Sequence, residues 1–137
     1  MADWLVKSEP ETWSWDSHLK AGADSWTGVR NHQAKAHLKA MKPGDRVFFY
    51  HSGDVRAVVG ESRVVREAYP DPTDPTGAFV AVDLKAVAPL KRPVSLIEIK
   101  AEPKLADMVL VKNSRLSVQP VTAAEWTIIS ALSGGKA

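Results

Sequence analysis

Hydrophobic and polar residues alternate over several short stretches of the chain, and this period of two predicts β-strands. The clearest alternation covers 79–87, while 46–52 is rich in residues with high β-propensity. Gly53 and Asp54 follow the second stretch and predict a hairpin turn. The predicted strands, in chain order, are 4–7, 46–52, 57–67, 79–87 and 116–119.

A helical period is clearest after Asn31, a favourable N-cap, where Ala34, Leu38 and Met41 recur on one helix face. Two later segments begin with Ser or Thr followed three residues on by Glu, which is the capping-box signature of a helix start. Ser8–Glu11 has the same form, with a proline at an early helical position. The helices expected from these signals are 12–20 (a short helix or turn), 32–41, a short helix from 95, and 122–132.

The intervening segments favour loops. Three prolines within 69–77 predict one loop, and 23–28 is interpreted as another. Gly60 interrupts a predicted strand and indicates a bulge or a close backbone approach. About five or six strands with short helices between them, without strict β–α alternation, predict an α+β fold. We expect a mixed or antiparallel sheet curled into an open barrel, in a single domain spanning 1–137.

Composition narrows the class of protein. The chain has 137 residues, of which 45% are hydrophobic and 25% charged, as in a single globular domain. It contains no cysteine, which excludes disulfides, thiolate zinc sites and a cysteine nucleophile. No apolar run is long enough to span a membrane, and the N-terminus is too polar for a signal peptide. We therefore expect a cytoplasmic protein without a membrane partner.

Catalytic and metal-binding patterns are weak. The glycine motifs that cradle phosphates are missing, and so are HExxH and GxSxG. His32 and His37 are five residues apart, which fits a metal-binding helix face poorly, so we expect no metal and no cofactor. Glu9, Glu11 and Asp16 cluster near the first predicted helix and leave an acid–base enzyme open as an alternative.

The aromatic residues give a stronger signal. Four of the five tryptophans lie between positions 4 and 26. We expect Trp4 and Trp126 in the core, and of Trp13 and Trp15 one in the core and one partly exposed. Trp26, in a predicted loop beside a glycine, is the best candidate for a functional aromatic. Tryptophan next to polar residues suits a planar heteroaromatic ligand, which is bound by stacking and by hydrogen bonds at its edge.

Basic residues gather near the second predicted helix. Arg30, Lys35, Lys39 and Lys42 lie on or beside it with no acidic residue between them. They indicate either contacts to phosphates or an ordinary solvated face. The net charge of the whole chain is only +2, which is low for a protein that grips nucleic acid over its whole surface.

Several unusual sequence words occur in a fixed order. They are WLVKSEPETWSWD (4–16), WTGVRN (26–31), GD (44–45), FYHS (49–52), VG (59–60), AYPDP (68–72), RPV (92–94) and RLSVQP (115–120). Through these words, from about residue 3 to 130, the sequence resembles the EVE domain family. The resemblance implies a PUA-like fold, which is a curled mixed β-barrel flanked by short helices. It also implies kinship with the YTH domain, which reads a methylated adenine in RNA through an aromatic cage.

EVE domains are regarded as readers of modified bases, with modified cytosine in DNA as the leading candidate. The resemblance implies Trp26 as a wall of an aromatic cage. The expected base pocket comprises Lys7, Ser8, Glu9, Trp26, Val29, Asn31, Tyr50, His51, Ser52, Leu116 and Ser117. The expected phosphate contacts are Arg30, Lys35, Lys39 and Arg115.

The leading hypothesis is a monomeric binding module for nucleic acid with a modified base, such as 5-methylcytosine, with DNA favoured over RNA. One alternative is a reader of a modified base in RNA. The other is a small hydrolase or base-processing enzyme that uses Glu9, Glu11 or Asp16.

Overall fold

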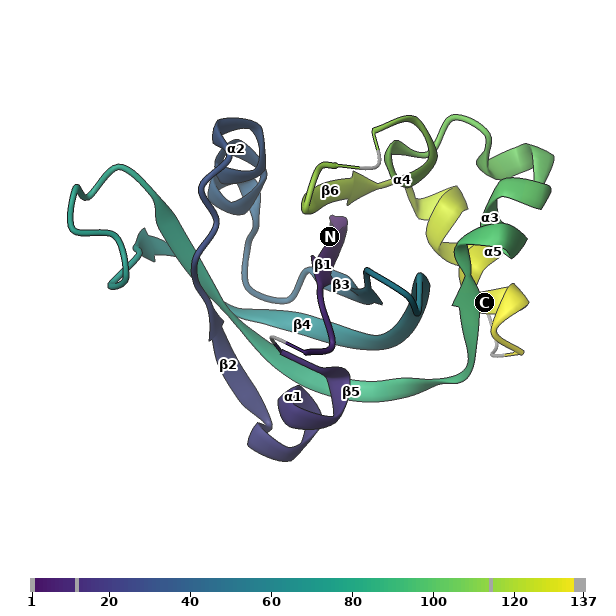
Figure 1. Cartoon of the computed structure of the whole chain (residues 1–137), viewed down its shortest axis with the longest axis horizontal. Coiled ribbons are helices and arrows are strands. Elements are labelled where there is room, and N and C mark those ends of the chain that lie inside the picture. The colour runs from purple at the N-terminus through teal and green to yellow at the C-terminus, as the bar shows by residue number, and fades with distance from the viewer. Residues whose placement is uncertain (1, 12, 114, 135–137) are drawn as a thin grey trace.

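A computed structural model of the chain describes residues 2–11, 13–113 and 115–134 and shows a mixed α+β fold (Figure 1). The strands are β1 (Asp3–Ser8), β2 (Ala23–Trp26), β3 (Arg46–His51), β4 (Ala57–Pro70), β5 (Val80–Ser95) and β6 (Val118–Val121). The helices are α1 (Trp15–Ala21), α2 (His32–Ala40), α3 (Leu96–Ala101), the 3₁₀ helix η1 (Pro103–Leu105), α4 (Val109–Lys112) and α5 (Ala123–Leu132).

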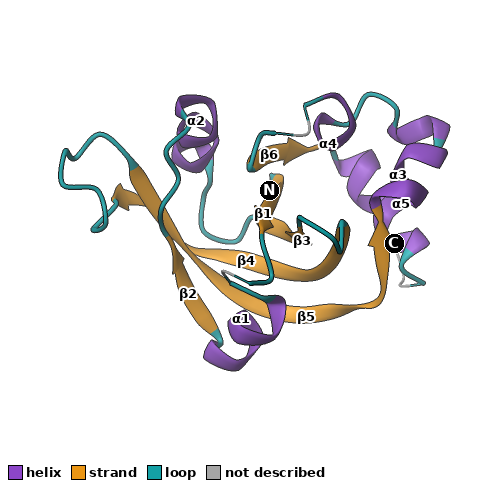
Figure 2. Ribbon diagram, in the orientation of Figure 1, coloured by secondary structure: helices purple, strands orange, loops and turns teal. Residues whose placement is uncertain are grey.

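All of these strands join one six-stranded sheet in the order β2-β5-β4-β3-β1-β6. β1 pairs with β3 in parallel, and every other neighbouring pair is antiparallel. The long strands β4 and β5 sweep across the molecule, with α3, α4 and α5 gathered at one end and β2, α1 and α2 at the other (Figure 2). The mixed sheet and the short flanking helices confirm the predicted fold class.

Both faces of the sheet are buried, since apolar residues occupy consecutive positions of its central strands. On β1, Trp4 and Val6 belong to one core, while Leu5 between them belongs to a second core. The first core also takes Trp26 from β2 and Val118 from β6, which are the two edge strands. Edge strands that share one core require a strongly curled sheet, as the resemblance implies.

Three helices begin at their predicted caps. The Asn31 side chain accepts the N–H of Ala34 at 2.9 Å and starts α2. Ser95 and Thr122 form complete capping boxes that start α3 and α5. The four-residue helix α4 was not predicted, because it begins without a side-chain cap and leaves no signal in the sequence.

The predicted helix start at Ser8 is wrong. Ser8 remains in β1, where pairing with β3 holds it extended, and its hydroxyl donates to the carbonyl of Trp13 at 2.6 Å. The helix begins at Trp15 instead, with Ser14 as its N-cap. Thr12, at the start of the predicted helix or turn, lies outside the described residues.

The predicted loop at 23–28 is wrong for its first four residues, because residues Ala23–Trp26 form β2 against β5. Both β4 and β5 continue beyond their predicted ends at 67 and 87, so Tyr69 and Pro70 belong to β4 rather than to a loop. Much of β5 beyond the predicted end is exposed, and alternation of apolar and polar residues is lost there. The last strand lies two residues later than predicted, at 118–121 rather than at 116–119.

Gly60 has the predicted role in both respects. The β4 register shifts beside it, and a Cβ atom at this position would lie 2.6 Å from ring carbons of Trp15. Trp15 is buried and Trp13 partly exposed, which confirms the expected division between them. Trp4 and Trp126 are buried, as expected for core residues.

Candidate functional site

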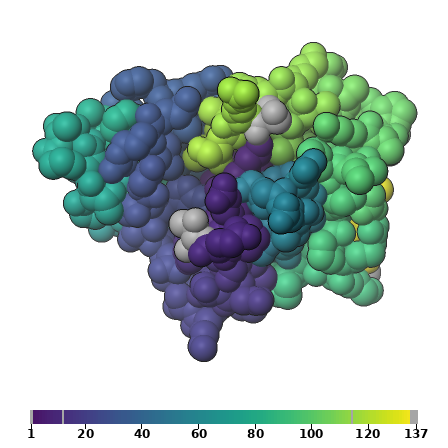
Figure 3. All heavy atoms as spheres, in the orientation of Figure 1, coloured from purple at the N-terminus to yellow at the C-terminus, as the bar shows by residue number. Residues whose placement is uncertain are grey.

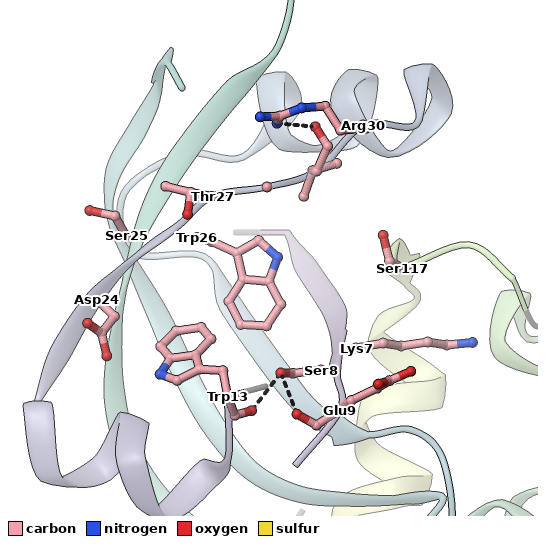
Figure 4. A pocket seen from close by; sticks show the side chains of 12 residues that line it. Lys7, Ser8, Glu9, Trp13, Asp24, Ser25, Trp26, Thr27, Arg30 and Ser117 are labelled. Atoms are coloured by element: carbon pink, nitrogen blue, oxygen red, sulfur yellow. Dashed lines mark hydrogen bonds between the residues drawn. The ribbon is translucent and has the colours of Figure 1, made fainter. Parts of the chain in front are cut away.

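A cavity of about 560 Å³ opens at the end of β1, where this strand, β2 and the segment after β2 meet. It is lined by Lys7, Ser8, Glu9, Trp13, Asp24, Ser25, Trp26, Thr27, Gly28, Val29, Arg30 and Ser117. The rings of Trp13 and Trp26 lie between Asp24 and Ser25 on one side and Lys7, Ser8 and Ser117 on the other (Figure 4). In the space-filling view the purple N-terminal segment lies at the centre of this face, beside the yellow-green segment around β6 (Figure 3).

The two tryptophans form one continuous aromatic wall. Their ring centroids are 4.8 Å apart at an interplanar angle of 51°, and each ring meets Phe49 with its edge or face at 5.7 Å. A base placed between two parallel rings needs roughly twice the stacking spacing of about 3.4 Å. The rings are closer than that, so a base has room to lie against this wall but not between its two members.

The sequence predicted Trp26 in a loop, but Trp26 is the last residue of β2. It is only 6% exposed, because its ring packs into the first core. The partly exposed ring of Trp13 extends the wall beyond it.

The end of β1 is tied to its neighbours by hydrogen bonds on both sides. The N–H of Lys7 donates to the carbonyl of Ser117 at 2.9 Å, and the N–H of Ser52 donates to the carbonyl of Ser8 at 3.0 Å. The Ser8 hydroxyl also holds the carbonyl of Trp13. These bonds fix the polar side of the cavity relative to its aromatic wall.

The opposite rim is clamped by a buried carboxylate, Asp71, from the loop between β4 and β5. One carboxylate oxygen accepts the N–H of Gly28 at 2.8 Å and a guanidinium N–H of Arg30 at 3.1 Å. The other accepts the N–H and the hydroxyl of Thr73, both at 2.7 Å. Burial alone would raise the pKa of Asp71, but hydrogen bonds from Thr73, Gly28 and Arg30 lower it to about 2.

The charged groups of the cavity are partly shielded from water. Burial lowers the pKa of the Lys7 ammonium, whose nitrogen lies 5.6 Å from the centre of the Tyr50 ring. The carboxylate of Asp24 lies 3.8 Å from Nδ1 of His18, a residue with no exposed surface. Burial lowers the pKa of His18, and Asp24 opposes this shift only in part.

The structure brings together part of the predicted base pocket. Of the predicted residues, Lys7, Ser8, Glu9, Trp26, Val29 and Ser117 line the cavity. Tyr50 and Ser52 line a neighbouring cavity instead. Asn31 caps α2, and Nε2 of His51 accepts the N–H of Trp15 at 2.9 Å. Leu116 is buried in the first core.

The predicted phosphate contacts are spread more widely. Arg30 lines the cavity but is paired with Asp71 and also donates to Thr73 at 3.0 Å. Lys35 lies with its nitrogen 5.7 Å from the Phe79 ring centre. Lys39 and Arg115 are exposed, and neither lines the cavity.

Sequence reasoning missed several lining residues, namely Asp24, Ser25, Thr27 and Gly28, and assigned no binding role to Trp13. Asp24, Ser25, Thr27 and Gly28 lie within two residues of Trp26 in the chain. A β-strand predicted at 23–26 would therefore have placed them beside Trp26 at the cavity. Asp71 has no such signal, because its loop is 41 residues from Arg30 in the chain.

Two further properties bear on the class of protein. Within the described ranges, no group of three or more His, Asp or Glu side chains is arranged to hold a metal ion. None of the helices in that part of the chain is long and apolar enough to cross a membrane.

Comparison with known proteins gives consistent matches. The EVE domain family model matches residues 2–132. Thymocyte nuclear protein 1 from Homo sapiens is 34% identical, over 94% of this chain and 72% of that protein. A protein from Rhodopseudomonas palustris, solved by NMR, has 58% identity and a TM-score of 0.93, covering 98% of this chain and 94% of its own. Human THYN1 protein, crystallised in complex with 5-methylcytosine-containing DNA, has 32% identity and a TM-score of 0.89, with both chains fully covered.

Proposed function

This chain belongs to the EVE domain family, and on that premise we propose that it is a nucleic-acid-binding module for DNA that carries 5-methylcytosine. The modified base would leave the stack and enter the cavity beside Trp13 and Trp26. The observation that carries the proposal is the pairing of an aromatic wall with polar groups on both sides of it (Figure 4). The DNA complex of the human relative supports the choice of ligand.

The cavity suits a single nucleobase. Its volume of about 560 Å³ lies in the range of roughly 300–1,000 Å³ usual for small-ligand sites. Extrusion of a base costs a few kcal/mol, and stacking on the tryptophan wall supplies roughly 1–3 kcal/mol to offset it. The hydroxyls of Ser8 and Ser117 and the carboxylates of Glu9 and Asp24 supply the remaining contacts.

The carboxylates favour cytosine among the bases. Its exocyclic amino group is a donor, and a carboxylate is the acceptor that proteins commonly offer to it. Asp24 and Glu9 line the cavity from opposite sides of the tryptophan wall (Figure 4). Burial of one methyl group against apolar walls is worth about 1–3 kcal/mol, so the module would prefer the methylated base without absolute discrimination.

We propose binding without turnover. Of the three carboxylates considered for an enzyme, only Glu9 lines the cavity. Glu11 and Asp16 face His51 instead, where burial lowers the pKa of the imidazole and their two charges oppose that shift. His18 and Ser62 are hydrogen-bonded at 2.8 Å, but neither has exposed surface, so no substrate reaches this hydroxyl.

RNA is the second candidate polymer, because the resemblance to RNA-reading relatives leaves it open. A matched pair of DNA and RNA strands with the same modified base separates the two ligands, since they differ at the 2′-hydroxyl. We expect DNA to win this competition, and stronger binding of RNA would replace DNA in the proposal.

The wall itself is tested by replacing Trp13 and Trp26 separately. We expect Trp13→Ala and Trp26→Phe to weaken binding and to reduce the preference for methylated over plain cytosine, because both remove ring surface from the cavity. Trp126→Phe is the control, since Trp126 lies in the second core and away from the cavity. An unchanged preference in both wall variants would contradict the assignment of the base to this cavity.

A further inference from the structure

A second cavity of about 300 Å³ lies on the other side of Lys7, which lines both cavities. It is formed by Lys7, Tyr50, Ser52, Gly53, Arg56, Leu96, Lys100 and Leu110. These residues come from the ends of β1 and β3, the hairpin after β3, and helices α3 and α4.

The lining of the second cavity is positively charged. It contains Lys7, Arg56 and Lys100 but no carboxylate. Some lysines and arginines of the chain have acidic partners, as Arg46 does with Asp3 at 2.8 Å. In contrast, neither Arg56 nor Lys100 has a carboxylate of a described residue within 4.0 Å. Two cations such as Arg56 and Lys100, which line one cavity without a carboxylate partner, are a usual arrangement for binding an anion.

The backbone of Arg56 is held in an unusual conformation. Its φ of 46° is the only positive value at a non-glycine position among the described residues. Two hydrogen bonds maintain it: Leu96 donates its N–H to the Arg56 carbonyl at 2.8 Å, and Nε of Arg56 donates to the Gly53 carbonyl at 3.0 Å. The terminal guanidinium nitrogens make no hydrogen bond to a described residue and remain available to a ligand. Backbone strain of this kind is commonly retained at ligand-binding positions.

We infer that the second cavity is a phosphate site, in which Arg56 and Lys100 hold a backbone phosphate next to the nucleotide whose base enters the first cavity. The inference rests on the proposed function, because Lys7 places the two cavities side by side on one strand end. It assigns the backbone contact to residues other than Arg30, whose charge is already balanced by Asp71.

The test compares the Arg56→Gln/Lys100→Gln variant with a control, Lys20→Gln/Lys91→Gln. Both lose two positive charges, but Lys20 and Lys91 are exposed and line none of the cavities described. The ligand is a short single-stranded DNA with one cytosine, methylated or plain. A second set of strands carries an uncharged methylphosphonate at one of the two linkages that flank this cytosine. Circular dichroism checks the fold, and Lys100→Gln alone provides a milder variant.

We expect the double variant to bind both strands roughly tenfold more weakly than the wild type, as for loss of a charged hydrogen bond. The methylated-to-plain affinity ratio stays unchanged. The salt slope of log K falls in magnitude by about 0.7, as for one phosphate contact on a single strand. The wild type weakens on methylphosphonate substitution at one flanking linkage, whereas the double variant does not.

The inference would be overturned if the double variant had the affinity and the salt slope of the wild type. It would also be overturned if methylphosphonate weakened binding of both proteins equally. Either result would leave the proposed function standing. A wild-type protein without preference for the methylated strand would instead contradict the proposed function. The phosphate site is then judged by the salt slope and the methylphosphonate comparison alone.

Discussion

Replacing Asp71 by Asn perturbs the rim of the first cavity without touching its aromatic wall. An amide keeps one acceptor oxygen and turns the other into a donor. In the wild type, both oxygens of the Asp71 carboxylate accept hydrogen bonds. One oxygen accepts from Gly28 and Arg30, and the other accepts from Thr73. At least one N–H donor is therefore left without its acceptor in Asp71→Asn, and the pairing with the Arg30 charge is lost.

The magnitude follows from the pKa of Asp71, which the hydrogen bonds lower from 3.8 to about 2 although burial opposes them. A difference of nearly two pH units corresponds to about 2.5 kcal/mol, which agrees with the roughly 1.5–3 kcal/mol typical of hydrogen bonds to a charged group. We expect the free energy of unfolding to fall by about 2–3 kcal/mol at pH 7, with a Tm lower by about 6–12 °C. Because the folded pKa is depressed, this stabilisation is present above pH 4 and disappears as the pH falls from about 4 to 2.

The assay is urea unfolding of wild type and Asp71→Asn at pH 7 and at several values down to pH 3, together with DNA binding at pH 7. Asp74→Asn is the matched control, because the Asp74 carboxylate bonds only to Thr76 and Phe79 within its own loop. We expect both variants to lose stability. We expect only Asp71→Asn to weaken DNA binding, because only Asp71 holds the Gly28–Arg30 rim. Equal stability of Asp71→Asn and wild type at pH 7, or a gap that does not narrow on acidification, would refute this reasoning.

Three other predictions concern the packing behind the site. Gly60→Ala should lower the free energy of unfolding by about 1–3 kcal/mol in urea, because its Cβ would lie 2.6 Å from Trp15; an unchanged midpoint would show that the ring moves aside freely. Asp45→Ala should cost about 1–3 kcal/mol, because Asp45 accepts the buried indole N–H of Trp4 at 3.0 Å; thermal unfolding measures this, and a wild-type Tm would contradict it. The His18 ring should titrate below its ordinary pKa of 6.5 in NMR spectra, since burial lowers its pKa. As the pH falls, His18 of the unfolded chain is protonated before His18 of the folded chain, so the free energy of unfolding decreases below pH 6.5. A pKa of 6.5 or above in the folded protein would contradict the burial argument.

The sequence predicted those elements whose signals are local. The cap at Asn31 and the capping boxes at Ser95 and Thr122 start helices at the expected residues, because a capping side chain bonds to backbone three residues away. The Ser8 motif has the same form but fails, since Ser8 is held in β1 by strand β3, about forty residues later in the chain. Tertiary pairing overrides a local preference in that case, and nothing in the motif itself reveals it.

The candidate site divides in the same way. Trp26 and the residues at the end of β1, Lys7 to Glu9, were predicted and lie together, because two short segments carry them, whereas the residues directly beside Trp26 were missed. Asp71 and Arg56 were missed, because the rim contact of Asp71 and the phosphate contact proposed for Arg56 depend on distant hydrogen bonds or on an unusual backbone conformation rather than on a motif. Tyr50 and Ser52 were expected beside the base but line the second cavity, which shares Lys7 with the first.

The measurement that tests the central claim most directly is a titration of the wild-type chain, by tryptophan fluorescence at fixed moderate salt. Its ligands are DNA strands that differ only in one cytosine, plain or 5-methylated. The account predicts tighter binding of the methylated strand by roughly 5- to 100-fold, as for burial of one methyl group. It also predicts a reduced preference in Trp13→Ala, because the Trp13 ring is half of the wall. Equal affinity for the two strands would contradict the account.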